Sequence, residues 1–369
     1  GNGFELGKIG HETICSGSPG NVKRSAGLGN EPAGSGIARS RVRSDTGTQQ
    51  ERTFTMQQRK LGRHGLIVGA IGYGAMGTAI GYGPSDDKES IAAIRRAHEL
   101  GVTHFDTARM YGWGEGEKLL GIALRPIRDQ VTIATKFGLT EGYAPDSRPE
   151  TIRQVVDSSL RNLGVETIDL LYQHIPDPNV PIEDVVGVMQ EFVQAGKVRY
   201  LGLSNSDEDT IRRASAVAPI SVQQYQYSIF ARDVEPLLPV LEELGIGLVA
   251  YSPLARGFLT GHVTSRDQYA ADDFRQNLGW WAPGNFGKNM EIAEELTSLA
   301  TAKGISLSQL ALAWLLARKD YVVPIPGSRN PQRVAQNISA AELVLTEADL
   351  KRIDEIAPRG GIGGRVWGE

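Results

Sequence analysis

The chain has 369 residues, of which 40 % are hydrophobic and 22 % charged, with a formal net charge of −4 and a pI near 6.0. This length suits one large α/β domain or two smaller ones, and the composition is that of an ordinary globular protein. The acidic balance argues against a nucleic-acid partner, and no apolar run approaches the roughly 18–20 residues of a membrane span.

A single cysteine, Cys15, excludes an intrachain disulfide framework and a multi-cysteine metal site, and it suggests a reducing compartment. Residues 1–55 hold no continuous apolar core of the kind that a signal peptide needs. We therefore expect a cytoplasmic protein without a metal centre and without a membrane anchor.

Residues 1–55 differ from the rest of the chain, because they are rich in Gly, Ser, Arg, Asn and Thr and show no periodicity. Such a segment cannot bury enough apolar surface to offset the entropy of ordering, so we expect a disordered leader or an artificial extension. A second interpretation is a basic arm, with Arg39, Arg41 and Arg43, that binds an acidic partner. Regular patterning begins at Met56, and we expect the fold to cover residues 56–358 and a flexible Gly-rich tail to cover residues 359–369.

From Met56 onward, short apolar runs alternate with segments of helical periodicity. Strands are expected at Val68–Tyr73, Val102–Phe105, Val131–Thr135, Ile168–Tyr172, Val198–Leu203, Ile220–Gln224, Gly247–Tyr251 and Tyr321–Ile325. Helices are expected at Asp86–Leu100 with Ser85 as N-cap, and at Arg148–Leu163, Pro181–Ala195, Asp207–Val217, Val234–Leu244 and Lys288–Ala302. Eight strands, each followed by a helix, predict a (β/α)8 barrel. A doubly wound sheet would need fewer strands or a second domain, and no linker divides the chain.

Three additions to the barrel are expected. Gln58–Leu61 and Leu66–Val68 indicate a hairpin before the first barrel strand. The long segment Gly257–Phe286, rich in Gly, Asp, Asn and aromatic residues, follows the seventh strand and is typical of a lid or binding loop. After the eighth strand, Pro331–Ala340 and Glu347–Ala357 are expected to be extra helices.

Gly72–Gly77 matches the pattern G-x-G-x-x-G, which can mark a dinucleotide-binding turn. That turn must open a helix directly, whereas Gly81, Gly83 and Pro84 delay the expected helix here. We therefore interpret these glycines as places where the backbone at the rim turns tightly or approaches a ligand.

Four polar residues, Asp106, Tyr111, Lys136 and His174, follow three successive strands. Each has an ordinary alternative, since the aspartate suits a turn, the tyrosine a loop anchor and the histidine a core position. If the strands are parallel neighbours, however, all four side chains gather at one rim. A lysine ammonium lowers the pKa of a nearby tyrosine from about 10, an aspartate keeps that lysine charged, and a histidine can hydrogen-bond a substrate oxygen. This set predicts proton transfer to a carbonyl.

The chain resembles the aldo-keto reductase superfamily across nearly all of residues 56–358. The resemblance rests on the Asp-Thr-Ala-x-x-Tyr-Gly box at Asp106–Gly112, on Thr135–Phe137, Gly202–Asn205 and Gln224–Ser228, and on Ala250–Leu254. Tyr172–His174 and Ser252–Gly257 are similar to the branch of bacterial and plant members that includes relatives of potassium-channel β-subunits. The resemblance implies Tyr111 as general acid, Lys136 and Asp106 as the groups that tune it, and His174 as the residue that orients the substrate.

The resemblance also implies a nicotinamide cofactor. Ser204, Asn205 and Gln224 would bind the carboxamide, Tyr251 would stack on the nicotinamide, and the pyrophosphate would lie at Ser252, Pro253, Leu254 and Arg256. The adenosine end would lie at Gly327, Ser328, Arg329, Arg333, Gln336 and Asn337, where a helix N-terminus and arginines suit a 2′-phosphate. NADPH is therefore expected over NADH, although some members carry a lysine where this chain has Gly327. The two arginines could instead serve surface solubility.

The substrate is expected to be a small carbonyl compound or alcohol. Aromatic residues expected near the mouth are Tyr82, Trp113, Tyr227, Trp280 and Trp281, each of which could equally be a packing anchor. A second hypothesis from another class is a cofactor-binding, redox-sensing regulatory subunit similar to the channel β-subunits. The sequence does not determine the oligomeric state.

Overall fold

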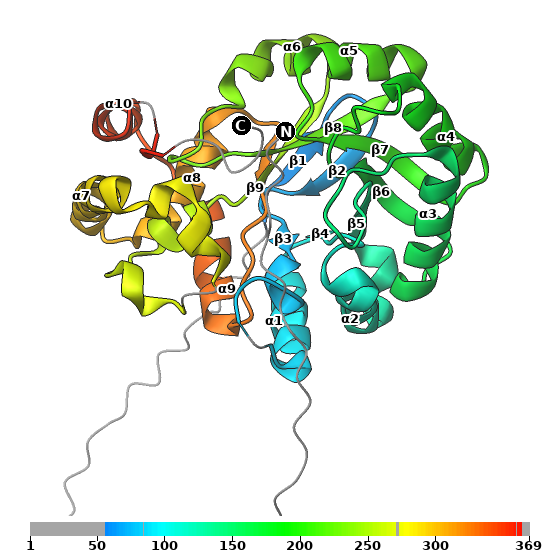
Figure 1. Cartoon of the computed structure of the whole chain (residues 1–369). Coiled ribbons are helices and arrows are strands. Elements are labelled where there is room, and N and C mark those ends of the chain that lie inside the picture. The colour runs from blue at the N-terminus through cyan, green and yellow to red at the C-terminus, as the bar shows by residue number, and fades with distance from the viewer. Residues whose placement is uncertain (1–55, 84, 271–272, 359, 364–369) are drawn as a thin grey trace, which may run out of the picture. The chain divides into compact units, whose positions relative to one another are not determined.

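The computed structural model describes residues 56–83, 85–270, 273–358 and 360–363, and Figure 1 shows their arrangement. The expectations for the leader, residues 1–55, and for residues 359 and 364–369 of the tail lie outside the described residues.

Eight parallel strands form one sheet in chain order, and they are β3 (Tyr73–Gly74), β4 (His104–Asp106), β5 (Thr132–Phe137), β6 (Ile168–Gln173), β7 (Val198–Ser204), β8 (Ile220–Gln226), β9 (Gly247–Tyr251) and β10 (Val322–Pro324). The first and last strands meet, because the amide of Gly72 donates to the carbonyl of Pro324 at 2.9 Å and that of Gly74 to Pro326 at 3.4 Å. The sheet therefore curls into the predicted (β/α)8 fold.

Helices lie on the outside of this sheet (Figure 1), and they are α1 (Asp87–Glu99), α2 (Glu115–Leu124), α3 (Pro149–Leu163), α4 (Ile182–Gln194), α5 (Glu208–Val217), α6 (Leu238–Leu244), α7 (Pro283–Ala302), α8 (Leu307–Arg318), α9 (Pro331–Ile338) and α10 (Glu347–Ile356). Helix α3 illustrates how the pattern works, since Ile152, Val156 and Leu163 are buried on one face and Gly164 ends the helix at φ 65°. Helix α8 was not predicted from the sequence. It buries an unbroken run from Leu310 to Leu315, so it has no polar face there and shows no amphipathic period.

The core has two layers. The outer layer packs the helices against the strands, and the inner layer fills the barrel. The hairpin of β1 (Gln58–Leu61) and β2 (Leu66–Gly69) contributes Leu61, Leu66 and Val68 to the inner layer, in one cluster with interior residues such as Ala134 and Val249. The hairpin therefore fills one end of the barrel and leaves the carboxyl ends of the strands for a site.

Several expected boundaries change. Val68 and Gly69 belong to the hairpin, so the first barrel strand shrinks to Tyr73–Gly74. The N-cap of α1 is Asp86 rather than Ser85, because its carboxylate accepts from the amide of Glu89. Helix α7 begins at Pro283 rather than at Lys288, since proline suits the first helical turn.

The described part of the tail binds the body of the fold. The amide of Ile362 donates to Oδ1 of Asn289 at 2.7 Å, and Nδ2 of Asn289 donates back to the Ile362 carbonyl at 2.7 Å. The amide of Gly361 donates to the carbonyl of Phe230 at 2.9 Å. Residues 360–363 thus contact the body of the fold through hydrogen bonds.

No single helix among the described residues is long and apolar enough to cross a membrane. Helices α7 and α8 meet the length and composition criteria only when taken together, and they are bent by 88° relative to each other.

Candidate active site

The carboxyl ends of the strands surround a cavity of about 360 Å³. Asp106 ends β4, Tyr111 lies in the loop that follows it, and His174 directly follows β6; all three line the cavity. Lys136 on β5 lies beneath them, with its side chain fully buried. Parallel neighbouring strands therefore bring the four predicted residues to one rim.

Lys136 and Asp106 form a buried ion pair at the base of the cavity. Nζ of Lys136 lies 2.5 Å from Oδ1 of Asp106 and donates to the Thr107 carbonyl at 2.7 Å, while Nε2 of Gln224 donates to Oδ2 of Asp106 at 2.7 Å. Burial tends to lower the pKa of Lys136, but Asp106 and Tyr111 outweigh it, and the pKa lies above its ordinary value. Lys136 is therefore a permanent cation at neutral pH.

Tyr111 lies beside this cation, with Nζ of Lys136 at 5.3 Å from the centre of its ring. Burial raises the pKa of Tyr111, Lys136 opposes this, and the pKa lies above its ordinary value of 10. The expected lowering by Lys136 is thus present but is outweighed by desolvation of the phenolate. Tyr111 holds its proton until another group takes it.

His174 faces Tyr111 edge-on, with 6.2 Å between the ring centres. Burial and the charge of Lys136 lower the pKa of His174 well below 6.5. The imidazole is therefore neutral at pH 7, and it can exchange hydrogen bonds with a substrate oxygen but is not charged to act as an acid.

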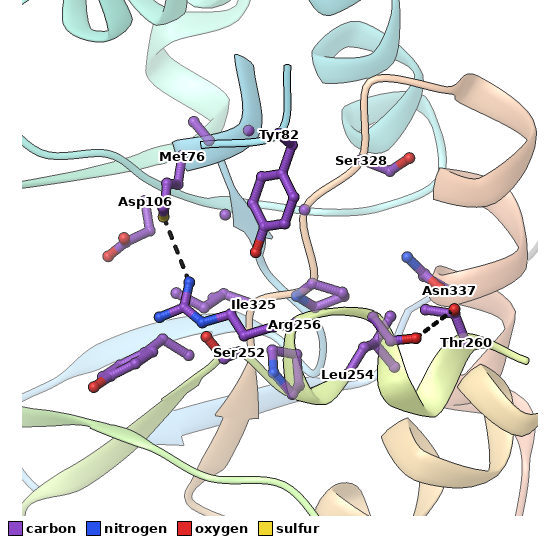
Figure 2. A pocket seen from close by; sticks show the side chains of 18 of the residues that line it. Met76, Tyr82, Asp106, Ser252, Leu254, Arg256, Thr260, Ile325, Ser328 and Asn337 are labelled. Atoms are coloured by element: carbon purple, nitrogen blue, oxygen red, sulfur yellow. Dashed lines mark hydrogen bonds between the residues drawn. The ribbon is translucent and has the colours of Figure 1, made fainter. Parts of the chain in front are cut away.

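All fourteen residues predicted for cofactor binding line the same cavity as the catalytic candidates, and they are Ser204, Asn205, Gln224, Tyr251, Ser252, Pro253, Leu254, Arg256, Gly327, Ser328, Arg329, Arg333, Gln336 and Asn337. They come from the ends of β7, β8 and β9, from the loop that follows β9, from the segment that joins β10 to α9, and from α9 itself. Figure 2 shows how part of this set is arranged around the hollow.

Asn205 connects the strand ends around the catalytic candidates. It has φ 58°, its Oδ1 accepts from the Tyr251 hydroxyl at 2.9 Å, and its Nδ2 donates to the His174 carbonyl at 3.2 Å. The flat face of Tyr251 is thereby held at the rim, one strand along from Gln224.

The loop after β9 carries backbone strain, since Ser252, Ala255 and Arg256 have φ values of 50°, 49° and 55°. It directs the Arg256 guanidinium across the cavity toward Met76 (Figure 2), with a nitrogen 3.6 Å from the Met76 sulfur. No carboxylate among the described residues lies within ion-pair distance of Arg256. The Arg256 guanidinium is thus a cation in the wall of the cavity, and it suits an anionic ligand.

At the other end of the cavity, Arg329 donates to the carbonyls of Tyr82 at 2.7 Å and Gly83 at 3.3 Å. Asn330 caps α9, accepting from the amide of Arg333 at 2.9 Å. At Gly327 an added Cβ would lie 2.3 Å from the carbonyl oxygen of Gly74. The close contact between β3 and the segment after β10 therefore leaves no room for a side chain at position 327.

Of the five aromatic residues expected at the substrate mouth, only Tyr82 lines the cavity. Trp280 and Trp281 are 1 % and 0 % exposed and pack into the core, Trp281 with its ring 4.1 Å from that of Phe258. Tyr227 is buried against Trp314, and its hydroxyl donates to Glu235 at 2.9 Å. These three positions are corrected to core anchors.

Trp113 also lies outside the cavity lining and packs beside Tyr143, 5.8 Å between ring centres. Its φ of 52° belongs to a turn between two positive-φ glycines, Gly112 and Gly114. This turn ends the Tyr111 loop and starts α2.

Gly74 and Gly77 of the G-x-G-x-x-G segment line the cavity together with Ala75 and Met76. The cavity residues outside this segment that were not predicted as site residues are Met110, Gly257, Thr260, His262, Tyr269, Arg275, Ser308, Ile325 and Pro326. The glycine pattern ends in a short 3-10 turn at Met76–Thr78 and does not open a long helix. This agrees with the interpretation that it is not a Rossmann turn. Tyr269 and Arg275 lie in the expected lid segment, which does contribute to the cavity.

The described residues hold no cluster of three or more His, Cys, Asp or Glu side chains that could bind a metal.

The site thus combines a buried Asp–Lys pair with a tyrosine and a neutral histidine at the carboxyl rim of a (β/α)8 barrel. Residues 70–358 match the aldo/keto reductase family, and the chain belongs to this family. It is 41 % identical over 320 residues to "Probable aldo-keto reductase 1" of Glycine max, covering 85 % of this chain and 92 % of that protein. It is 38 % identical over 313 residues to "Aldo-keto reductase yakc [NADP(+)]" of Schizosaccharomyces pombe, covering 82 % and 92 %.

Solved structures are similar as well. The glycerol dehydrogenase AKR11B4 from Gluconobacter oxydans is 32 % identical with a TM-score of 0.75, covering 84 % of this chain and 96 % of that one. An aldo/keto reductase from Klebsiella pneumoniae, solved with NADP and acetate, is 26 % identical with a TM-score of 0.65, covering 84 % and 100 %.

Proposed function

We propose that this protein is an NADPH-dependent reductase that converts an aldehyde or ketone reversibly to an alcohol. The observation that carries this proposal is the position of Lys136 Nζ, 2.5 Å from Asp106 and 5.3 Å from the ring of Tyr111. The relative from Schizosaccharomyces pombe is named for NADP(+), and the Klebsiella pneumoniae structure contains NADP, which supports the choice of cofactor. A cytoplasmic location remains the expectation from the single cysteine.

The residues of the cavity fit a phosphorylated dinucleotide. Arg256 has a buried Nε without a hydrogen-bond partner among the described residues, and Arg329 and Arg333 lie at the start of α9, where backbone amides favour anions. Tyr251, Ser204, Asn205 and Gln224 would hold the nicotinamide end, and Ser252–Arg256 would hold the pyrophosphate. Bound NADPH would supply a hydride to the carbonyl carbon.

The chain itself supplies the proton and the orientation. The hydroxyl of Tyr111 donates its proton to the carbonyl oxygen as that oxygen becomes an alkoxide. His174, neutral in this site, hydrogen-bonds the same oxygen and aligns it with Tyr111. Lys136 stabilises the phenolate that Tyr111 leaves behind, and Asp106 keeps Lys136 charged and in place. In the reverse direction the phenolate of Tyr111 accepts the proton of an alcohol.

The test follows NADPH absorbance with a panel of aldehydes, ketones and quinones, for the wild type and for Tyr111→Phe. We expect turnover by the wild type, and loss of turnover with preserved NADPH binding in the variant. Full activity of Tyr111→Phe would contradict its role as the acid. Tight NADPH binding without turnover of any compound would favour the redox-sensing regulatory subunit instead.

A further inference from the structure

Glu117 on α2 is a fully buried carboxylate that the proposed mechanism does not use. Its Oε1 accepts from the Thr135 hydroxyl at 2.7 Å, and its Oε2 accepts from Nδ2 of Asn162 at 3.0 Å. No lysine or arginine among the described residues lies within ion-pair distance of it. A buried charge held only by neutral donors costs free energy, so its position calls for an explanation.

Toward β5, Glu117 holds the strand that carries Lys136. Successive side chains of a strand point to opposite faces, so Lys136 points into the barrel while Thr135 points outward to α2. The hydrogen bond from Thr135 therefore ties the back of this strand to Glu117.

Toward the loop after β4, the residue that precedes Glu117 binds the backbone of Tyr111. Gly116 precedes Glu117, and its amide donates to the carbonyl of Tyr111 at 3.0 Å. A Cβ at Gly116 would lie 2.9 Å from that same carbonyl oxygen, so the start of α2 packs directly on the backbone of Tyr111. A shift of Glu117 would move this contact.

The third partner, Asn162, fixes the start of α2 from α3. Its amide nitrogen lies near Gly114, where an added Cβ would be 2.6 Å from Asn162 Nδ2 and 3.3 Å from Nη1 of Arg109. Gly114 has φ 107° and belongs to the turn that leads from Tyr111 into α2. Strand β5 and helix α3 thus both donate to one carboxylate on α2, beside the residue that contacts the Tyr111 carbonyl.

We propose that Glu117 is a positioning residue that sets the place of the Tyr111 phenol relative to the Lys136 ammonium. It acts through Thr135 and Gly116 and lies outside the cavity lining, so it touches neither substrate nor cofactor. The inference rests on the proposed function, in which Tyr111 is the acid and Lys136 stabilises its phenolate.

Glu117 accepts both of these hydrogen bonds, from Thr135 and from Asn162, so exchanging donors and acceptors tests the proposal. In Glu117→Gln the side-chain oxygen can still accept from Thr135, but the carboxylate is lost, and Asn162 must turn its amide over to accept from the new NH2 group. In the double variant Glu117→Gln/Asn162→Asp the amide faces a carboxylate, which restores the pairing and keeps the net charge. In Asn162→Asp alone, the new carboxylate faces that of Glu117, so the two acceptors repel each other.

We expect each single variant to lower kcat by roughly 10- to 100-fold, as a misplaced catalytic group does, with little change in the NADPH dissociation constant. The double variant should recover most of the wild-type kcat. The tyrosinate absorbance of Tyr111, isolated by subtracting the Tyr111→Phe titration, should move to higher pH in the single variants and return in the double variant.

The titration needs no substrate, so it tests the positioning role even if no carbonyl compound is turned over. Unchanged kcat and an unchanged Tyr111 titration in both single variants, Glu117→Gln and Asn162→Asp, would overturn the proposal. So would a joint loss of activity, NADPH binding and thermal stability that the double variant fails to recover, because that pattern belongs to a general packing role.

Discussion

The ammonium of Lys136 and the carboxylate of Asp106 face each other at 2.5 Å with side-chain exposures of 0 % and 2 %. Two charges this deeply buried stabilise the fold only as a pair, because each alone would be desolvated without compensation. In the proposed mechanism the same pair supports Tyr111, so mutations should separate its effect on stability from its effect on activity.

Asp106→Asn should leave the Lys136 ammonium buried without a counter-charge. We expect a loss of about 3–5 kcal/mol in the free energy of unfolding and a fall in kcat of about 10²- to 10⁴-fold. Denaturant unfolding and steady-state kinetics measure the two effects. The double variant Asp106→Asn/Lys136→Met, which has no buried charge, should regain stability but not activity; recovery of activity there would contradict the role of Lys136.

The pH dependence of the two reaction directions should differ. The pKa of Tyr111 lies above 10 and that of His174 well below 6.5, so between these values Tyr111 carries its proton and His174 is neutral. Reduction should therefore show a nearly flat kcat/KM between pH 6.5 and 10, whereas alcohol oxidation, which needs the phenolate, should rise with pH. A fall of the reductive rate near pH 7 would show that another ionisation controls it.

His104 should make the protein sensitive to acid. It is fully buried, both ring nitrogens lack a partner among the described residues, and burial lowers its pKa to about 4. Between pH 4 and 6.5 the unfolded chain binds a proton at this residue that the folded chain does not, so the stability that is present above 6.5 decreases by about 3 kcal/mol as the pH falls through this range.

His104→Leu removes this titration. Unfolding midpoints at several pH values should show a shallower acid decline in the variant and similar stability at pH 7, since an apolar side chain suits a site without hydrogen-bond partners. A decline as steep as that of the wild type would mean that other groups cause it.

Arg329→Ala should raise the KM for NADPH far more than the KM for NADH, because only NADPH carries the 2′-phosphate that an arginine at this helix start would bind. Arg329 also donates to the carbonyls of Tyr82 and Gly83. Arg329→Lys keeps the charge and serves as the control, with a smaller expected effect. Equal increases for both cofactors would instead point to the loop contact.

Trp281→Ala should act on stability rather than on substrate choice. Trp281 is fully buried against Phe258, and removal of such a side chain costs about 3–5 kcal/mol. Thermal unfolding and the relative kcat/KM values for aromatic and aliphatic carbonyl compounds check this. A change in the ranking of substrates without loss of stability would restore Trp281 to the substrate site.

Local patterns were sufficient for most of the barrel. Apolar runs alternate with amphipathic segments such as α3. An amphipathic segment shows that one face of a helix is buried, and this pattern can be read from neighbouring residues alone. The pattern failed at α8, where Leu310–Leu315 are buried all round, and at β3, where two residues are too few to show a period.

The aromatic residues show where sequence reasoning stops. Tyr82 and Trp281 both lie in Gly-rich loops, yet one lines the cavity and the other lies in the core. The direction of a loop side chain depends on contacts between residues that are separated in the sequence, such as the contact of Trp281 with Phe258. No local period encodes such contacts.

The sequence by itself determined the barrel, the identity of the four catalytic candidates and the fourteen residues that line the cavity with three of them. The barrel and the four candidates follow from residue types placed at the ends of parallel strands, where chain order alone brings them to one rim. The fourteen cavity residues were implied by the resemblance to the aldo-keto reductase superfamily. Only the tertiary structure decided the balance of forces on Tyr111, where burial outweighs Lys136, and the place of Glu117 between Thr135 and Asn162. Both depend on desolvation and on hydrogen-bond geometry between separate elements, which exist only once the chain has folded.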